Sequence, residues 1–185
     1  PFMDAVPGLH DAVHLGKVYD LVEEDKTNGR PTWDRVIVDA PATGHGLHIL
    51  NALRAMMELT QRGPIYKNAK LVHDLTSNTA RTGIVMTCLP ESMPVSETLQ
   101  LHKQLDASGY NVTAVVLNEI MSPDLPSAEE WPTIRSHLEQ HKHPTNAALV
   151  ERYFARTEQQ QHAKSVLQTA IGAPLIELPM VLNSA

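Results

Sequence analysis

Thiols and long apolar runs are both scarce in this sequence of 185 residues, which contains a single cysteine, Cys88. One thiol excludes an internal disulfide and a zinc site built from several thiolates, and this favours a reducing compartment. A membrane helix needs about 20 mostly apolar residues, and a secretory leader needs a basic and then an apolar stretch, and we find neither. These absences predict a cytoplasmic protein without a transmembrane segment.

Positive charge is scarce as well, with 15 Lys and Arg against 21 Asp and Glu and a formal net charge of -6 at pH 7. Nucleic-acid binding draws much of its affinity from cationic side chains that displace counterions from phosphates. We therefore expect no nucleic-acid partner. The 42% of hydrophobic residues is ordinary for a globular protein and argues against a disordered chain.

The pattern of apolar residues predicts an α/β fold, with a mostly parallel sheet flanked by helices. Four short apolar runs read as strands: residues 36–39, 83–89, 112–118 and 175–178. The third is rich in β-branched residues, as in a strand covered on both faces. Helical spacing covers residues 10–26, 44–60, 67–79, 94–108, 127–141 and 145–171. Ser92 or Pro94 begins the fourth helix, and Gly109 ends it.

Domain organisation is predicted to be simple, with one α/β domain over residues 1–185. Residues 122–146 are rich in proline and polar side chains and interrupt the α/β rhythm. We interpret them as an inserted surface segment rather than a domain boundary.

Asp39 is the first candidate for chemistry, because it ends an apolar run and ligands collect at the carboxyl ends of parallel strands. The small residues 41–45 follow, in front of a predicted helix whose first N–H groups can face an anion. A turn containing glycine changes its dihedral angles at little cost and can act as a switch. The alternative is an aspartate that only caps the next turn.

Residues 39–47, Asp-Ala-Pro-Ala-Thr-Gly-His-Gly-Leu, resemble the switch II sequence Asp-x-Ala-Pro-Thr-Gly-His-Thr-Leu-Arg of the arsenical pump-driving and guided-entry tail-anchored-protein ATPases. Pro41 and Ala42 are in reversed order, Gly46 replaces Thr, and His48 replaces Arg. Three more segments are similar to family elements in the same order: residues 7–12, 83–109 and 178–180. The resemblance implies a P-loop NTPase-like fold, present in part.

The same resemblance implies a site for ATP and Mg²⁺. It makes Asp39 the catalytic residue that holds the magnesium-bound water, and it assigns sensing of the terminal phosphate to switch II: Ala40, Pro41, Ala42, Thr43, Gly44 and His45. It also implies a nucleotide pocket formed by Glu91, Asn118, Pro179 and Met180.

The pocket residues also make chemical sense by themselves. The amide of Asn118 offers a donor and an acceptor, which can pair with the amino group and a ring nitrogen of adenine. Three of the four residues have a plainer alternative: Asn118 as a turn former, Glu91 as a carboxylate at a helix N-terminus, and Pro179 as the end of a strand.

The phosphate-binding motif G-x-x-x-x-G-K-[ST] does not occur in the 185 residues, nor does the aspartate-bearing switch I of the family. We therefore expect the C-terminal part of a larger ATPase, inactive alone, and a degenerate paralogue is the alternative. The intact protein is expected to be a homodimer or paralogous heterodimer that closes on ATP and reopens on hydrolysis. The alternative function is a non-catalytic regulatory or binding partner of an active paralogue.

Cargo and metal sites are less defined. Met56 and Met57 widen the apolar surface of one predicted helix, which suits either a buried core or a groove for an apolar protein client or a membrane-associated partner. His137, His141 and His143 come near the spacing of helical metal ligands, but no carboxylate or cysteine cluster flanks them, and we expect no metal site there. One cysteine cannot supply the converging thiolates that arsenite binding needs.

Overall fold

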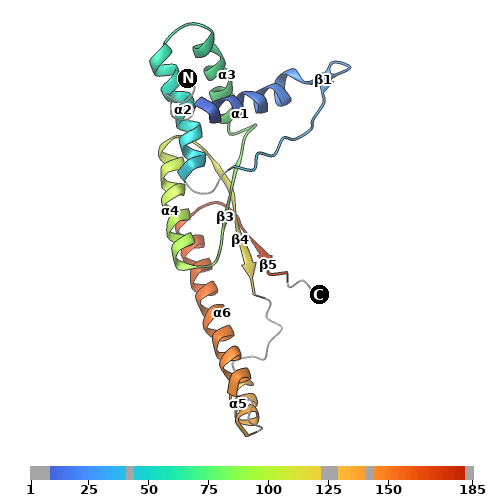
Figure 1. Cartoon of the computed structure of the whole chain (residues 1–185), viewed down its shortest axis with the longest axis vertical. Coiled ribbons are helices and arrows are strands. Elements are labelled where there is room, and N and C mark those ends of the chain that lie inside the picture. Colours follow the sequence, from blue (N-terminus) through green and yellow to red (C-terminus); the bar gives the residue numbers. More distant parts are fainter. Residues whose placement is uncertain (1–8, 41–43, 122–128, 141–143, 182–185) are drawn as a thin grey trace. The chain divides into compact units, whose positions relative to one another are not determined.

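The computed structural model describes residues 9–40, 44–121, 129–140 and 144–181 (Figure 1). The chain divides into two compact units, the first formed by residues 1–84 and 101–111 and the second by residues 85–100 and 112–185. The organisation of residues 1–185 as one domain stays a prediction.

The first unit is mainly helical (Figure 1). It contains the helix α1 (Leu9–Tyr19), the π-helix η2 (Asp20–Glu24), the strands β1 (Lys26–Thr27) and β2 (Arg30–Pro31), and the helices α2 (Gly44–Thr60) and α3 (Pro64–Thr76). Leu53 of α2 and Val72 of α3 form its core, and Leu15, Tyr19 and Met56 pack against them. Met56 is therefore a core contact, as the first of the two interpretations of the Met pair predicts.

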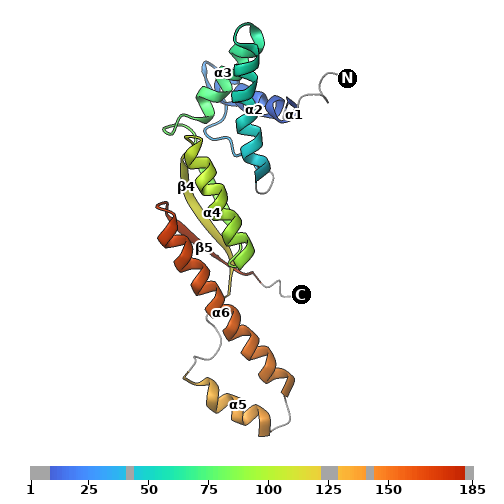
Figure 2. The same ribbon diagram turned by 90° about the vertical axis from the view of Figure 1, so that its left-hand side faces the viewer.

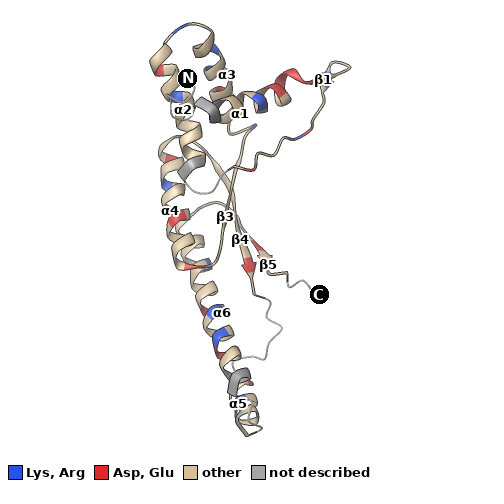
Figure 3. Cartoon of the chain, in the orientation of Figure 1, with Lys and Arg blue, Asp and Glu red and all other residues tan. Residues whose placement is uncertain are grey.

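A short antiparallel hairpin, β1–β2, extends from this unit, and the sequence analysis missed it. Its turn contains Asn28 and Gly29 with φ angles of 54° and 76°, the left-handed conformation that a two-residue hairpin turn requires. Asp25 holds the base of the hairpin, because its carboxylate accepts hydrogen bonds from the Thr32 hydroxyl at 2.9 Å and the Trp33 indole at 3.0 Å. Acidic residues gather nearby on η2 (Figure 3).

The second unit contains a three-stranded sheet of order β3-β4-β5, formed by β3 (Ile84–Cys88), β4 (Val112–Ile120) and β5 (Leu175–Pro179). Val115 of β4 pairs with Leu175 of β5 in parallel register. The connecting helices are α4 (Ser92–Ala107), of which residues 92–100 belong to this unit, α5 (Trp131–Gln140) and α6 (Pro144–Ala170). The predicted α/β class, a parallel sheet flanked by helices, is confirmed.

The two faces of this sheet differ in their surroundings. Met86, Cys88, Val115 and Leu117 are buried on one face, where α4 and α6 lie (Figure 2). The other face, which we call the open face, carries apolar side chains that alternate with these along the strands: Val85, Val116, Ile176 and Leu178. Val85 is 55% exposed, Ile176 47% and Leu178 45%. The described helices thus cover one face of β4, whereas two covered faces were predicted.

The strand predicted over residues 36–39 is wrong for the described residues, where this segment has no regular structure. A strand exists only through pairing with a neighbour, and the described chain supplies none. Ile37 is consequently 92% exposed.

The predicted inserted segment, residues 122–146, includes α5, and residues 122–128 and 141–143 lie outside the described residues. Helix α5 packs on α6 through the rings of Trp131 and Phe154, 5.7 Å apart, and through an ion pair of Arg135 with Glu151 at 2.8 Å. Within the second unit, helix α5 therefore packs on α6.

Candidate functional site

The carboxyl ends of the parallel strands in the second unit form the candidate site. Ile120 of β4 pairs with Pro179 of β5, and the backbone N–H of Met180 donates to the carbonyl of Ile120 at 2.8 Å. Asn118 lies two residues before Ile120 and is exposed. The structure thus brings three of the predicted residues, Asn118, Pro179 and Met180, to neighbouring strand ends, where ligands of open α/β sheets bind.

The end of β4 has an irregular backbone. Glu119 has a φ of 60°, and the register of β4 against β5 shifts between Leu117 and Ile120. A left-handed conformation at a residue with a side chain costs about 1–2 kcal/mol, so neighbouring interactions must hold it. This β-bulge directly follows Asn118, and a bulge re-aims the side chains beside it.

Glu91 follows β3 and precedes α4. Its carbonyl accepts a hydrogen bond from the N–H of Val95 at 3.0 Å, so it lies at the N-terminus of the helix, as the plainer interpretation predicts. Its carboxylate is 3.6 Å from the guanidinium of Arg156 on α6, and both side chains are about half exposed. Such a pair contributes at most about 1 kcal/mol, which leaves the carboxylate free to exchange partners.

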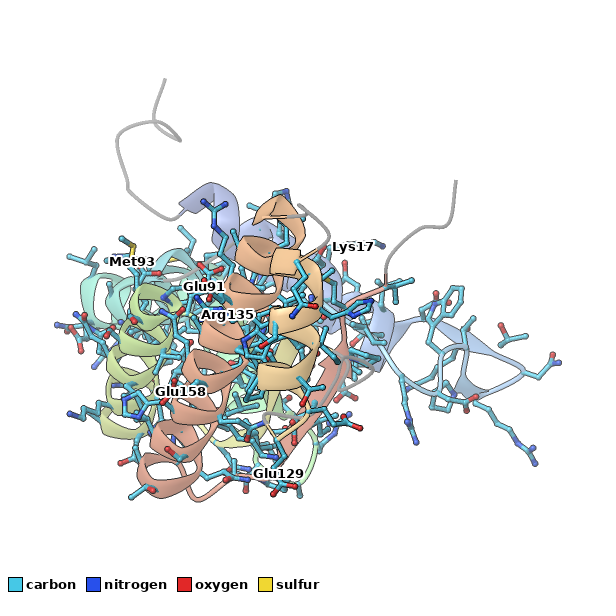
Figure 4. All side chains as sticks on the ribbon, turned by 90° about the horizontal axis from the view of Figure 1, so that it is seen from below. Lys17, Glu91, Met93, Glu129, Arg135 and Glu158 are labelled. Carbon is cyan, nitrogen blue, oxygen red and sulfur yellow. The ribbon has the colours of Figure 1, made fainter. Side chains whose placement is uncertain are left out.

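A hollow of about 500 Å³ lies between the start of α4 and α6 in the second unit. Figure 4 shows Glu91 and Met93, which line it from the α4 side. Arg152, Arg156 and Gln159 line it from α6. These three residues were not predicted from the sequence, and the four-residue spacing of the two arginines is the one signal that could have placed them on a common helix face.

Helix α6 contacts the residue Glu91 after β3, the end of β4, and β5 through three side chains, which are spaced four residues apart along the helix. Arg156 contacts Glu91 after β3, and Lys164 forms a 2.6 Å ion pair with Glu177 of β5. Between them, Gln160 accepts a hydrogen bond from the N–H of Met121 at 2.9 Å and donates one to the carbonyl of Glu119 at 3.1 Å. The four-residue period keeps these side chains on one side of the helix.

The switch II residues belong to the first unit, so the structure describes them separately from the strand ends. Asp39 and Ala40 are exposed and follow the irregular segment of residues 36–38. Gly44 and His45 begin α2, and Pro41, Ala42 and Thr43 lie outside the described residues.

Cys88 at the end of β3 is buried and donates from Sγ to the carbonyl of Leu89 at 3.1 Å. Burial raises the pKa of this thiol, and a hydrogen bond with Thr98 opposes the shift in part. A buried thiol with a raised pKa is a poor nucleophile.

Among the residues that the structure describes, His, Cys, Asp and Glu form no group of three suited to hold a metal ion. His137 lies on α5, and His141 and His143 fall outside the described residues. None of the described helices combines the length and apolarity that a membrane span requires.

The fold and the site define a class first: an α/β protein with a parallel sheet and polar residues gathered at the carboxyl ends of its strands. The sequence model of a family described as anion-transporting ATPase matches residues 58–158, which is more than half of the chain. The chain belongs to this family. The resemblance inferred from residues 39–47 and the three further segments is thereby confirmed.

Three curated relatives are themselves named ATPases. ATPase BagA of Mycobacterium tuberculosis is 29% identical over 191 residues, which cover 95% of this chain and 56% of that protein. ATPase GET3B of Arabidopsis thaliana is 22% identical, over 63% of this chain and 36% of its own length. The ATPase ASNA1 homolog of Dictyostelium discoideum is 24% identical, over 66% of this chain and 46% of its own length. The chain spans about half the length of the relatives that match it over most of its residues.

Proposed function

We propose that this chain is part of a longer ATP-hydrolysing protein, in which its strand ends bind the nucleotide base and Asp39 serves the hydrolytic reaction. The observation that carries the proposal is the meeting of Asn118 with Pro179 and Met180 at neighbouring strand ends. The names of the relatives support an ATPase family, and the finer roles are our inference from the residues and the resemblance.

The residues at the strand ends fit an adenine base. Asn118 is exposed and offers one donor and one acceptor, the complement of the adenine amino group and its ring nitrogen. Pro179, which pairs with Ile120, is exposed and Met180 is half-buried, and both offer apolar surface to a planar ring. Glu91, at the neighbouring strand end, supplies a carboxylate for a ribose hydroxyl.

Mg²⁺ prefers oxygen ligands and retains several waters, so one exposed carboxylate such as Asp39 suits an indirect, water-mediated contact. When bound, the ion neutralises charge on the transferring phosphoryl group. In this proposal Asp39 holds the metal-bound water, Ala40 to His45 sense the terminal phosphate, and the grip on the phosphates comes from protein outside these 185 residues.

Two features of the structure support a longer protein. The open face exposes Val85, Ile176 and Leu178, although parallel sheets normally have both faces covered. The apolar segment of residues 36–38 also lacks a strand partner among the described residues. Because BagA extends well beyond the matched region, we assign the cover of the open face to further polypeptide of the same protein. In this proposal the whole protein, rather than these 185 residues alone, forms the homodimer or paralogous heterodimer that closes on ATP and handles an apolar client.

The test compares the longer protein with the isolated 185-residue chain. We expect the longer protein to hydrolyse Mg-ATP and the isolated chain to show no turnover. In the longer protein, Asp39→Asn should lower kcat by about 100-fold or more while ATP binding changes little, because the loss falls on the reaction rather than on the base. Asp34→Asn, an exposed aspartate in the same segment, is the matched control and should leave kcat unchanged.

Turnover by the isolated chain at the rate of the longer protein would contradict the proposal. Nucleotide binding without turnover in the longer protein, unchanged by Asp39→Asn, would instead favour the non-catalytic partner of an active paralogue.

A further inference from the structure

Gln160 is buried in the middle of the longest helix, and hydrophobic packing does not explain it. It is 2% exposed and shares its helix face with Ala163 and Leu167, which are 5% and 1% exposed. An uncharged polar side chain on such a face is costly unless its hydrogen-bonding groups are satisfied. The position therefore calls for a specific partner.

The partner is the backbone of the β4 end. The Gln160 oxygen accepts from the N–H of Met121, and its nitrogen donates to the carbonyl of Glu119. A primary amide presents a donor and an acceptor side by side, as a neighbouring strand would. Gln160 thus substitutes for a missing strand partner at the bulge, where Glu119 has a φ of 60°.

We propose that Gln160 is a positioning residue for the base-binding amide of Asn118. The bulge that Gln160 holds begins one residue after Asn118, and the same backbone stretch pairs with Pro179 and Met180 through Ile120. When the two hydrogen bonds are lost, the left-handed Glu119 relaxes, and the aim of the Asn118 amide relaxes with it. This inference rests on the proposed function, since it needs a base at Asn118.

The chain offers a matched control, because Gln161 is the same residue type, adjacent on α6 and exposed. Gln160→Leu keeps the approximate volume and removes both hydrogen bonds. Gln160→Glu keeps the acceptor for Met121 but places a buried carboxylate oxygen against the carbonyl of Glu119, so it should disturb the bulge at least as much as Gln160→Leu does. Gln161→Leu leaves both hydrogen bonds of Gln160 in place.

The experiment titrates the longer protein with fluorescent mant-ATP and mant-GTP in the presence of Mg²⁺, and records the ratio of the two affinities. We expect Gln160→Leu and Asn118→Ala each to reduce the preference for ATP by roughly tenfold, the scale of one well-aligned amide–base pair. Gln160→Glu should reduce it at least as much, and Gln161→Leu should leave it unchanged. Amide hydrogen exchange at Met121 should be faster in Gln160→Leu than in the parent protein, and it should be unchanged in Gln161→Leu.

Two outcomes separate the failures. If Asn118→Ala leaves the ATP-to-GTP ratio unchanged, the base assignment itself is wrong, and the inference falls with it. If Asn118→Ala lowers the ratio but a folded Gln160→Leu or Gln160→Glu protein keeps it, Gln160 only stabilises the fold, and the inference alone is overturned. The ratio distinguishes the two because a purely structural defect weakens both nucleotides equally.

Discussion

At the scale of single residues, burial decides which titratable groups affect stability. Cys88 in the second unit and Tyr110 in the first are each 5% exposed. Burial raises the pKa of both groups above the ordinary 9.0 and 10.0. For Tyr110, the positive charge of Arg54 and a hydrogen bond with Thr76 oppose the shift in part. Both groups are therefore neutral in the folded protein at pH 7 and are costly to ionise there.

These shifts predict a loss of stability in alkali. Below about pH 8 both groups are essentially protonated in the folded and the unfolded chain, and their contribution is fully present. As the pH rises above the unfolded values, the unfolded chain ionises first, and the free energy of unfolding falls by up to about 1.4 kcal/mol per pH unit for each group. Urea unfolding between pH 8 and 11 measures this slope.

Cys88→Ala and Tyr110→Phe should each make that slope shallower, and their curves should run parallel to the parent curve between pH 7 and 8. Equal alkaline slopes in the parent and both variants would show that neither group titrates on unfolding as argued.

At the scale of elements, local sequence signals were sufficient to predict the bounds of helices and strands whose structure depends on neighbouring residues in the chain. The predicted bounds of α2, residues 44–60, are those observed, and the β3-α4-β4 unit matches to within two residues. The hairpin at Asn28–Gly29 also carried a strong local signal, and the sequence analysis missed it by extending the first helix to residue 26.

Non-local pairing set the limit of prediction. The apolar sequence of residues 36–38 predicts a strand, but a strand forms only when another segment pairs with it. The local sequence does not reveal whether such a partner is present. The contact of Gln160 with Glu119 joins residues 41 apart, and no local pattern reports it. The position of Asn118 and Pro179 near the ends of β4 and β5 was predictable because local sequence marks where a strand ends, whereas the bulge between Leu117 and Ile120 was not. Their role in nucleotide binding stays a prediction.

The end of α4 gives a test of one such local signal. Gly109 has a φ of 79°, its N–H donates to the carbonyl of Asp106 at 2.9 Å, and the N–H of Tyr110 donates to the carbonyl of Leu105 at 3.0 Å. This is a Schellman motif, which places the residue after the helix in the left-handed region. Gly109→Ala should lower the free energy of unfolding by about 1–2 kcal/mol.

Gly16 is the matched control, because it lies inside α1 and a Cβ there would meet nothing within 4 Å. Gly16→Ala should raise the free energy of unfolding by about 0.5–1 kcal/mol through better helix propensity. Opposite signs in denaturant titrations of the two variants confirm the motif, and a neutral Gly109→Ala refutes the strain argument.

At the scale of the whole molecule, the open face determines how this chain behaves alone and within a longer protein. Contiguous apolar surface on a sheet binds other apolar surfaces or promotes association. Covered by further polypeptide, the same side chains become core. One substitution on this face should therefore have opposite effects in the two contexts.

Ile176→Lys introduces a charge on β5, an edge strand of the sheet, where Ile176 pairs with Val116 on the open face. In the isolated chain it should reduce self-association and binding of the dye ANS, both of which we expect the unsubstituted chain to show, because Ile176 is 47% exposed there. In the longer protein it should lower the free energy of unfolding by roughly 3 kcal/mol, since a buried, unpaired charge is costly. Gln168→Lys, on an exposed position of α6, should change little in either context. Sedimentation and urea titration measure both effects, and a longer protein that tolerates Ile176→Lys without loss of stability would show that nothing covers this face.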